Sequence, residues 1–375
     1  MKDNLARQQA SYLQRNGVTM PPAVLTHALQ QMLALQSLYF EEPQAVSEAR
    51  EDFYSAPFWH ALAPGSSTDA EELRCALQFA AAQRVGAPSH AAILRHLVEE
   101  GFCIAPPAQR TTALCLELAR IQAQLQAAGL PPQFIFVFNA AWQLLEEHWA
   151  GPATAALGEG SFMEADMNCW ALRREPQEGA ASAYVGANFG VSHRDQAFSA
   201  CHCKDTGAPT SVNLWTPFNA SGAMADNGAM RVLPSCADDF FFSPEHPLHF
   251  ETAASLAVEG AREAVRVLQC GAGAACLWSP ALVHWGGGCA FGAAGEPRES
   301  LAVTFRGARA PRSQFGAASS ISGGGGEPGS SGPEPMLRSA LDSLSLPKRL
   351  AYVAKGLLSY SHWHPGFPGV ALAKA

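Results

Sequence analysis

The spacing of apolar residues predicts helices over most of the first third of the chain. Apolar side chains recur near helical spacing in three stretches: Val24, Leu25, Leu29, Met32, Leu33 and Leu38; Leu73, Leu77 and Ala81; and Leu114, Leu116, Leu118, Ile121 and Leu125. This period puts them on one face of an amphipathic helix. A short apolar run at residues 101–105, before two prolines, is typical of a single strand between helices that begins a sheet. We interpret residues 1–130 as a mainly helical region that packs on the rest of the molecule.

After residue 130 the pattern changes to short runs of β-branched and aromatic residues. Such runs occupy residues 134–138, 211–215, 262–268, 275–278 and 301–305, and Gly, Pro, Asn and Asp separate them. Short strands divided by turns are typical of a double-stranded jelly roll, which covers its sheet edges and leaves one mouth open. We therefore expect an α+β protein whose residues 131–310 form a jelly-roll core.

The last part of the chain divides into a loop and a helix. Residues 311–335 are rich in Gly, Ser and Pro, and the short supply of apolar side chains predicts a flexible surface loop. Apolar residues return at helical intervals after residue 336, which predicts a C-terminal helix and tail over residues 336–375.

Composition and charge narrow the class of partner. The chain has 375 residues, of which 48% are hydrophobic and 15% charged, and this balance is typical of a globular protein with a sizeable core. Its net charge of −8, with no Lys/Arg cluster, argues against nucleic acid and acidic membrane surfaces and favours a small-molecule substrate. We expect a monomer or homodimer.

Cysteine usage and the first residues bear on the compartment. The ten cysteines form no Cys-x-x-Cys pair, which favours reduced, intracellular thiols. Residues 1–20 lack the apolar run of a signal peptide, and no apolar stretch is long enough to span a membrane. The cytoplasm is the default expectation, and an organelle stays open.

Three residues carry the metal chemistry that we expect. His193 and Asp195 are two positions apart, and in extended backbone such residues project to the same side, so both can bind one ion. A third ligand has to come from a distant strand, and His284 lies in an apolar and aromatic segment followed by three glycines. Two imidazoles and one carboxylate form the facial triad of non-haem iron(II) sites. The competing interpretation of His284 alone is a buried core histidine.

Arg298 is the candidate partner for a carboxylate. It follows His284 by 14 positions, begins a predicted strand and has the hydroxyl of Ser300 two residues on. A guanidinium matches a carboxylate with two parallel hydrogen bonds. A solvated surface charge is the alternative for Arg298. Arg306 and Arg309 compete with Arg298 for the carboxylate, and Arg306, eight residues further along the same strand, ranks second.

These motifs together resemble the phytanoyl-CoA dioxygenase-like family of iron(II)/2-oxoglutarate-dependent oxygenases. The resemblance covers roughly residues 165–308. Its parts occur in the family's order: His193-x-Asp195, VNLWT at 212–216, NGAMRVLP at 227–234, His284-Trp285-Gly286 and Arg298-x-Ser300. It departs from the family at residues 234–237, where PSCA replaces Pro-Gly-Ser-His, and at Gly286, where a hydroxyl residue is common.

The resemblance implies a fold, cofactors and a reaction. The core would be a cupin-like double-stranded β-helix with iron(II) on His193, Asp195 and His284. Arg298 and Ser300 would bind the distal carboxylate of 2-oxoglutarate, with Trp215 beside it. With O2, the enzyme would hydroxylate a small organic substrate and convert 2-oxoglutarate to succinate and CO2. The carboxylate of Asp195 favours oxygen transfer over halogenation.

Two alternatives stay open, and the substrate contacts are a separate hypothesis. The same triad suits a zinc-dependent hydrolase or lyase, and a non-catalytic jelly-roll protein could keep the site for binding only. Trp170, Tyr184 and Asn188, which precede the triad on expected strands, are the candidates for substrate contact.

Overall fold

The computed structural model describes residues 52–83, 90–164, 167–172, 192–290, 292–308 and 336–359. The helices expected before residue 51, the loop at 311–335 and the tail after residue 359 lie outside the described residues. So do Tyr184 and Asn188. The boundaries at residues 130, 310 and 335 stay predictions.

The chain combines helices with antiparallel sheets, an α+β arrangement. The α-helices are α3 Ala56–Leu62, α4 Ala70–Gln83, α5 His90–Glu99, α6 Thr111–Ala127, α7 Asn139–His148, α8 Thr154–Leu157, α9 Phe198–Cys201, α10 Thr252–Ser255, α11 Ala261–Ala264 and α12 Leu346–Ser359. Short 3-10 helices are η1 Asp52–Tyr54, η2 Pro132–Val137, η4 Ser235–Ala237 and η6 Arg338–Ser343, and η3 Trp149–Ala153 is a π-helical turn. The predicted helices around residues 73–81 and 114–125 are confirmed as α4 and α6.

The strands form two sheets. They are β1 Phe102–Ala105, β2 Phe162–Met163, β3 Asn168–Ala171, β4 Ser211–Pro217, β5 Met230–Val232, β6 Arg266–Val267, β7 Ala275–Trp278, β8 His284–Gly286 and β9 Glu299–Arg306. The larger sheet has the order β1-β7-β4-β9-β2, with β3 also paired to β9, and the smaller has the order β6-β5-β8. The strands predicted at 101–105, 211–215, 275–278 and 301–305 are confirmed as β1, β4, β7 and β9.

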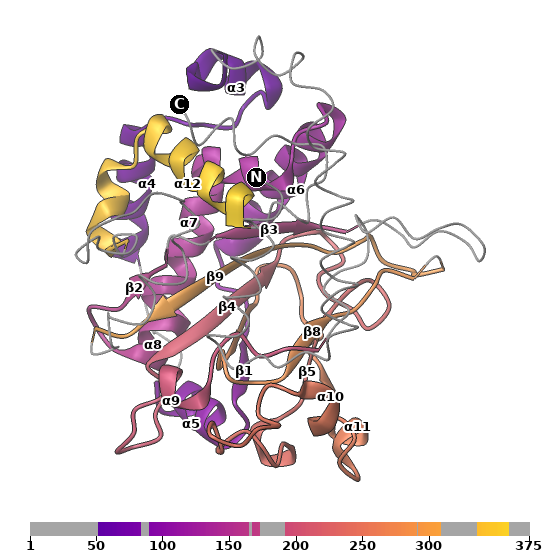
Figure 1. Cartoon of the computed structure of the whole chain (residues 1–375). Helices are drawn as coiled ribbons and strands as arrows, with labels where there is room; N and C mark the ends of the chain where they lie inside the picture. The colour runs from indigo at the N-terminus through magenta and orange to yellow at the C-terminus, as the bar shows by residue number, and fades with distance from the viewer. Residues whose placement is uncertain are drawn as a thin grey trace, which may run out of the picture.

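The large sheet has two different faces. Successive residues of a strand point to opposite sides, and directly paired residues share a side. On β9, Leu301, Val303 and Phe305 belong to the large hydrophobic core, whereas Ala302 packs with the second core cluster beside the small sheet. Figure 1 shows α4, α6, α7 and α12 on the side of β4 and β9 that faces the large hydrophobic core. The strands β5 and β8 lie on the opposite side, with α10 and α11 beyond them.

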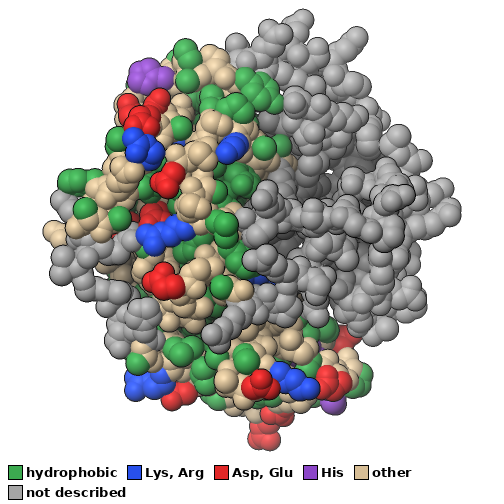
Figure 2. Space-filling view, turned by 90° about the vertical axis from the view of Figure 1, so that its left-hand side faces the viewer, with side chains coloured by type: hydrophobic (Ala, Val, Ile, Leu, Met, Phe, Trp, Pro, Cys, Tyr) green, Lys and Arg blue, Asp and Glu red, His purple; other side chains and the backbone are tan. Residues whose placement is uncertain are grey.

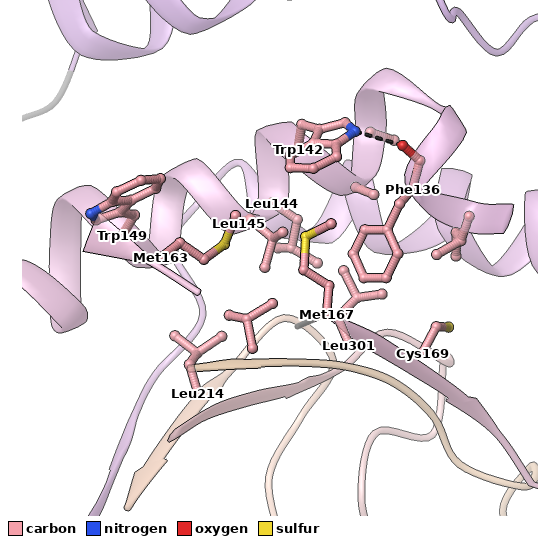
Figure 3. Close-up of a cluster of buried hydrophobic side chains, with 14 of the residues drawn as sticks. Phe136, Trp142, Leu144, Leu145, Trp149, Met163, Met167, Cys169, Leu214 and Leu301 are labelled. Atoms are coloured by element: carbon pink, nitrogen blue, oxygen red, sulfur yellow. Dashed lines mark hydrogen bonds between the residues drawn. The ribbon is translucent and has the colours of Figure 1, made fainter. Parts of the chain in front are cut away.

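The core lies between the helices and the large sheet. Figure 3 shows Leu214 and Leu301 rising from the sheet toward α7, which carries Trp142, Leu144 and Leu145. The indole of Trp142 donates a hydrogen bond of 2.7 Å to the carbonyl of Phe136, so its one polar atom is satisfied inside the core. Each fully buried leucine of this layer, such as Leu214 or Leu301, contributes roughly 1.5–3 kcal/mol. This layer covers one face of the large sheet, whereas the other face carries the second core cluster together with polar residues such as Asn213 and Thr304.

One predicted strand is wrong and another is confirmed only in part. Residues 134–138 belong mainly to the 3-10 helix η2, whose first residue is Pro132, and all five side chains are buried. A short apolar run that is buried on every side carries no period, so a strand and a buried helix look alike in the sequence. Residues 262–268 give only the two-residue strand β6, because Ala261–Ala264, built of good helix formers, is helical.

The surface of the described residues is mixed in charge on the side that lies to the left in Figure 1. Lys/Arg and Asp/Glu side chains alternate there with polar and apolar ones rather than gathering by sign (Figure 2). Over the same described ranges, no helix has both the length and the apolar character to cross a bilayer.

Candidate metal centre

A backbone bridge brings the first and third expected ligands side by side. His193 and His284 form an antiparallel bridge in which each N–H donates to the other's carbonyl, at 3.0 and 2.9 Å. His284 is also the first residue of β8 and pairs with Val232 of β5. Val232 packs in the cluster between the two sheets, and the ring of His284 lies 5.2 Å from that of Trp278. The His284 side chain therefore faces the space between the sheets.

The three side chains converge. The Nε2 of His193 is 3.6 Å from Oδ1 of Asp195, and the Nε2 of His284 is 3.4 Å from Oδ2. One ligand atom from each residue lies within 4.8 Å of the other two, and this is the one such His/Cys/Asp/Glu group found in the described part of the chain. Three ligand atoms on one face of an octahedral ion, each about 2.1 Å from it, lie about 3 Å from one another. The three side chains would therefore need to move only slightly toward one another to bind a metal ion.

His284 is prepared for coordination by its surroundings. Its Nδ1 lies 2.9 Å from the carbonyl of Leu282, which can only accept, so Nδ1 carries the proton and Nε2 keeps its lone pair. Burial lowers the pKa of His284 to about 4; the carboxylate of Asp195 opposes this shift and His193 adds to it. The ring is thus neutral near pH 7, the form that binds a metal.

Asp195 is held by residues of the large sheet. The amide of Asn213 on β4 donates a 2.6 Å hydrogen bond to Oδ2 of Asp195, and the hydroxyl of Thr304 on β9 donates to the amide oxygen of Asn213 at 2.9 Å. The backbone N–H of Asp195 donates to the carbonyl of Pro280 at 2.9 Å. The hydrogen bond from Asn213 thus restrains the rotation of the Asp195 carboxylate, both oxygens of which lie near a histidine Nε2.

Arg298 is a buried guanidinium whose charge has no partner among the described residues. It is 0% exposed, and its Nη1 donates to the hydroxyl of Ser300. Its Nε and Nη2 are buried without a hydrogen-bond acceptor in the described ranges. The guanidinium carbon lies 5.2 Å from the centre of the Trp215 ring. Burial lowers the pKa of Arg298 to about 9, which reflects the missing counter-charge.

The alternative arginine is already neutralised. Arg306, at the end of β9, forms an ion pair with Glu164. Arg298 has no such carboxylate among the described residues, so it is the one whose environment calls for an anion.

Arg298 and the three clustered residues border the same side of the large sheet. Asn213, which contacts Asp195, and Trp215, which contacts Arg298, are alternate residues of β4 and so share one face. Trp170 of β3 pairs with Ser300 and is partly buried, which puts it next to the Arg298 end of this face. The predicted metal ligands, the predicted co-substrate residues and Trp170 therefore all border the space between the two sheets.

Sequence reasoning did not single out Asn213, Thr304 or Arg194 for a role at the site. Asn213 could have been found from its position two residues before Trp215, on the same predicted face. Nothing in the sequence connects Thr304 with Asp195, because their link depends on the pairing of β4 with β9. No candidate metal site in the described residues includes Cys201, His202 or Cys203. The ring of His202 stacks on the ring of Phe198, with 4.0 Å between the ring centres.

Comparison with known proteins gives neighbours in structure alone. No protein-family model matches the sequence, and no curated protein matches it. Among solved structures, the chain is similar to the epimerase SnoN in complex with Fe3+, alpha ketoglutarate and nogalamycin RO, with 14% identity, a TM-score of 0.43, and coverage of 66% of this chain and 95% of that one.

The chain is also similar to two further solved structures. One is the non-heme alpha ketoglutarate dependent carbocyclase SnoK from nogalamycin biosynthesis, at 13% identity and a TM-score of 0.41, covering 60% of this chain and 88% of that one. The other is the non-heme monooxygenase ThoJ in its Ni complex, at 15% identity and a TM-score of 0.33, covering 58% and 78%.

Proposed function

We propose that this protein is an iron(II)/2-oxoglutarate-dependent oxygenase of the phytanoyl-CoA dioxygenase-like type that hydroxylates a small organic molecule. In this proposal the two facing sheets are the halves of a double-stranded β-helix, and the space between them is the active site. The observation that carries it is the pairing of a His-Asp-His cluster with a buried, uncompensated Arg298 on one side of one sheet.

The donor set fits iron(II). Two neutral imidazoles and a carboxylate leave three octahedral positions for a bidentate 2-oxo acid and O2. With iron(II), 2-oxoglutarate and O2 bound, the site would supply the oxidising chemistry that hydroxylates a carbon and yields succinate and CO2.

Arg298 fits the far carboxylate of 2-oxoglutarate. Its unpartnered Nε and Nη2 can donate to two oxygens, and its Nη1 already holds the Ser300 hydroxyl, which can turn its own proton to the same anion. A carboxylate there would neutralise a charge that is now buried alone, so binding is favoured by electrostatics that water would otherwise screen.

The protein's own residues have three tasks in this mechanism. Asn213 restrains the orientation of the Asp195 carboxylate by donating to Oδ2. The bond from His284 to the Leu282 carbonyl fixes the imidazole orientation. Trp215 gives the guanidinium and the co-substrate a flat, dry wall. Trp170 is proposed as a substrate contact.

The experiment is an anaerobic titration followed by oxygen. Adding Fe(II) and then 2-oxoglutarate should give the weak visible charge-transfer band of a chelated 2-oxo acid, and O2 should then yield succinate. His193→Ala should remove the band. Arg298→Lys should raise the Kd for 2-oxoglutarate about tenfold or more, because a point charge replaces the planar fork.

The matched control is Arg306→Lys, which alters the paired arginine at the other end of β9 and should leave that Kd within about twofold, since its partner is Glu164. Zinc binding without succinate would favour the hydrolase or lyase, and metal binding without any turnover would favour the non-catalytic protein. If Arg298→Lys and Arg306→Lys behave alike, Arg298 does not bind the co-substrate.

A further inference from the structure

Arg194 lies between two of the proposed metal ligands and points away from them. It stands between His193 and Asp195 in the chain, and its side chain is 0% exposed. Its hydrogen bonds and ion pair go to His249, Ser255, Ala281 and Asp238 rather than to the three ligand side chains, which puts the guanidinium behind the site.

The guanidinium contacts four groups from three other segments. Nε donates to the carbonyl of His249 at 2.6 Å, Nη1 to the carbonyl of Ala281 at 2.6 Å and Nη2 to the hydroxyl of Ser255 at 3.2 Å. Nη2 also forms an ion pair of 2.7 Å with Asp238, whose side chain is 0% exposed. Every nitrogen of the planar group is engaged, so its position is tightly determined.

These contacts connect the two ligand segments. Ala281 is three residues before His284, and its neighbour Pro280 accepts from the N–H groups of Asp195 and Gln196 at 2.9 and 3.1 Å. Two sets of contacts thus join the segment that contains His193 and Asp195 to the segment that contains His284. One is the backbone bridge between His193 and His284, and the other is the hydrogen bond from the Arg194 side chain to Ala281.

Stability alone is a weak reason for this arrangement. A buried ion pair offsets its own desolvation cost only with good geometry, and an apolar replacement of similar size is often equally stable. What an apolar side chain lacks is directional hydrogen bonding to the Ala281 carbonyl, which specifies one register between the segments.

We infer that Arg194, held by Asp238, is a positioning residue that sets the spacing of the metal ligands from behind the site. The inference rests on the proposed metal centre and adds a requirement that the triad alone does not contain: the guanidinium fork of residue 194.

Cobalt(II) binding to the full-length protein tests this without turnover. Wild-type protein should bind one Co2+, with a visible spectrum that reports the ligand geometry. Arg194→Lys keeps the charge but loses the fork, and it should weaken Co2+ binding about 10–100-fold and alter the spectrum, as expected when groups that orient metal ligands are changed. Asp238→Asn should also weaken Co2+ binding and alter the visible spectrum, but to a smaller extent than Arg194→Lys.

Arg349→Lys is the matched control. Arg349 is also fully buried and donates to the carbonyls of Leu344 and Val137 at 3.0 and 2.8 Å, but it lies in the helical layer. Its variant should lower Tm while Co2+ affinity and spectrum stay at the wild-type values.

The outcomes separate the two proposals. If wild-type protein binds no Co2+, the proposed function fails. If wild-type protein binds it and Arg194→Lys matches wild type or matches Arg349→Lys, the positioning role is overturned. Should Arg194→Lys not fold, Asp238→Asn decides in the same way, and failure of both to fold would make Arg194 a stabilising residue only.

Discussion

At the scale of single residues, the site is defined by which polar atoms are already satisfied. The Nδ1 of His284, the Oδ2 of Asp195 and the Nη1 of Arg298 each have a protein partner. The atoms left over are those that face the space between the sheets. A hydrogen bond to one atom of each side chain thereby sets the orientation in which its remaining polar atoms can meet a ligand.

Asn213→Ala tests this effect at Asp195. Without the 2.6 Å hydrogen bond the carboxylate can rotate, so we expect metal affinity to fall about 10–100-fold. Anaerobic Fe(II) titration measures it. Thr304→Val leaves the Asn213 bond to Asp195 in place and should have a smaller effect. Wild-type affinity in Asn213→Ala would mean that Asp195 needs no such support.

Glu299, beside Arg298 in the chain, should make stability depend on pH. Burial raises the pKa of its carboxyl from the ordinary 4.5 to about 7, and Glu296 adds to the rise. The folded protein then holds this proton more tightly than the unfolded chain does. The stabilisation is present below pH 4.5 and is lost as pH rises through 7, by an amount on the order of 2 kcal/mol.

Urea unfolding of wild type and Glu299→Gln across this range measures the effect. The variant should lack this decline between pH 4.5 and 7, and Glu296→Gln should reduce it. An identical pH slope in wild type and Glu299→Gln would contradict the assignment.

At the scale of elements, the turn before β5 brings its backbone close to the arginine. Arg298 donates its N–H to the carbonyl of Asn227 at 3.0 Å, and Gly228 has a φ of 108°. A Cβ at Gly228 would lie 2.2 Å from Cδ1 of Leu172 and 3.3 Å from the carbonyl of Gly287. Glycine is required here for both conformation and space.

Gly228→Ala should therefore cost roughly 1–3 kcal/mol of unfolding free energy. Gly65→Ala is the control, because Gly65 has a φ of 81° and a Cβ added there would meet nothing within 4 Å, so this variant reports the conformational cost alone. Thermal and denaturant unfolding of the two variants should show the larger loss at Gly228. Equal losses would show that crowding at the turn is relieved by movement of Leu172.

At the scale of the whole molecule, the large sheet has the hydrophobic core on one face and the candidate site on the other. Leu214 and Trp215 are neighbours on β4, yet Leu214 belongs to the core under the helices and Trp215 to the cluster between the sheets. The alternation of the strand assigns them to different tasks.

A pair of variants on β4 tests this separation. Leu214→Ala should lower the unfolding free energy by about 2–5 kcal/mol and leave the Kd for 2-oxoglutarate unchanged. Trp215→Phe should cost less than about 1.5 kcal/mol and raise that Kd several-fold, because the indole under Arg298 is lost. Denaturant curves and the charge-transfer titration give both quantities, and the reverse allocation would rule out a two-faced sheet of this kind.

Local sequence was sufficient for the elements with a clear period or clear boundaries. It determined α4, α6, β4, β7 and β9, and it identified His193, Asp195, His284 and Arg298 as the side chains with the right chemistry. It failed at residues 134–138, where an apolar run without a period became a buried 3-10 helix, because burial on all sides removes the alternation that marks a strand.

Only the tertiary structure decided which of these residues meet and what each is missing. The bridge from His193 to His284, the support of Asp195 by Asn213 and Thr304, and the clamp of Arg194 all join segments distant in sequence. The pairing of Arg306 with Glu164, a residue more than a hundred positions away, likewise leaves Arg298, of the two arginines, as the one without a carboxylate partner among the described residues. Spacing along a chain determines which way a side chain points, whereas partners and burial depend on strand pairing, which no local pattern contains.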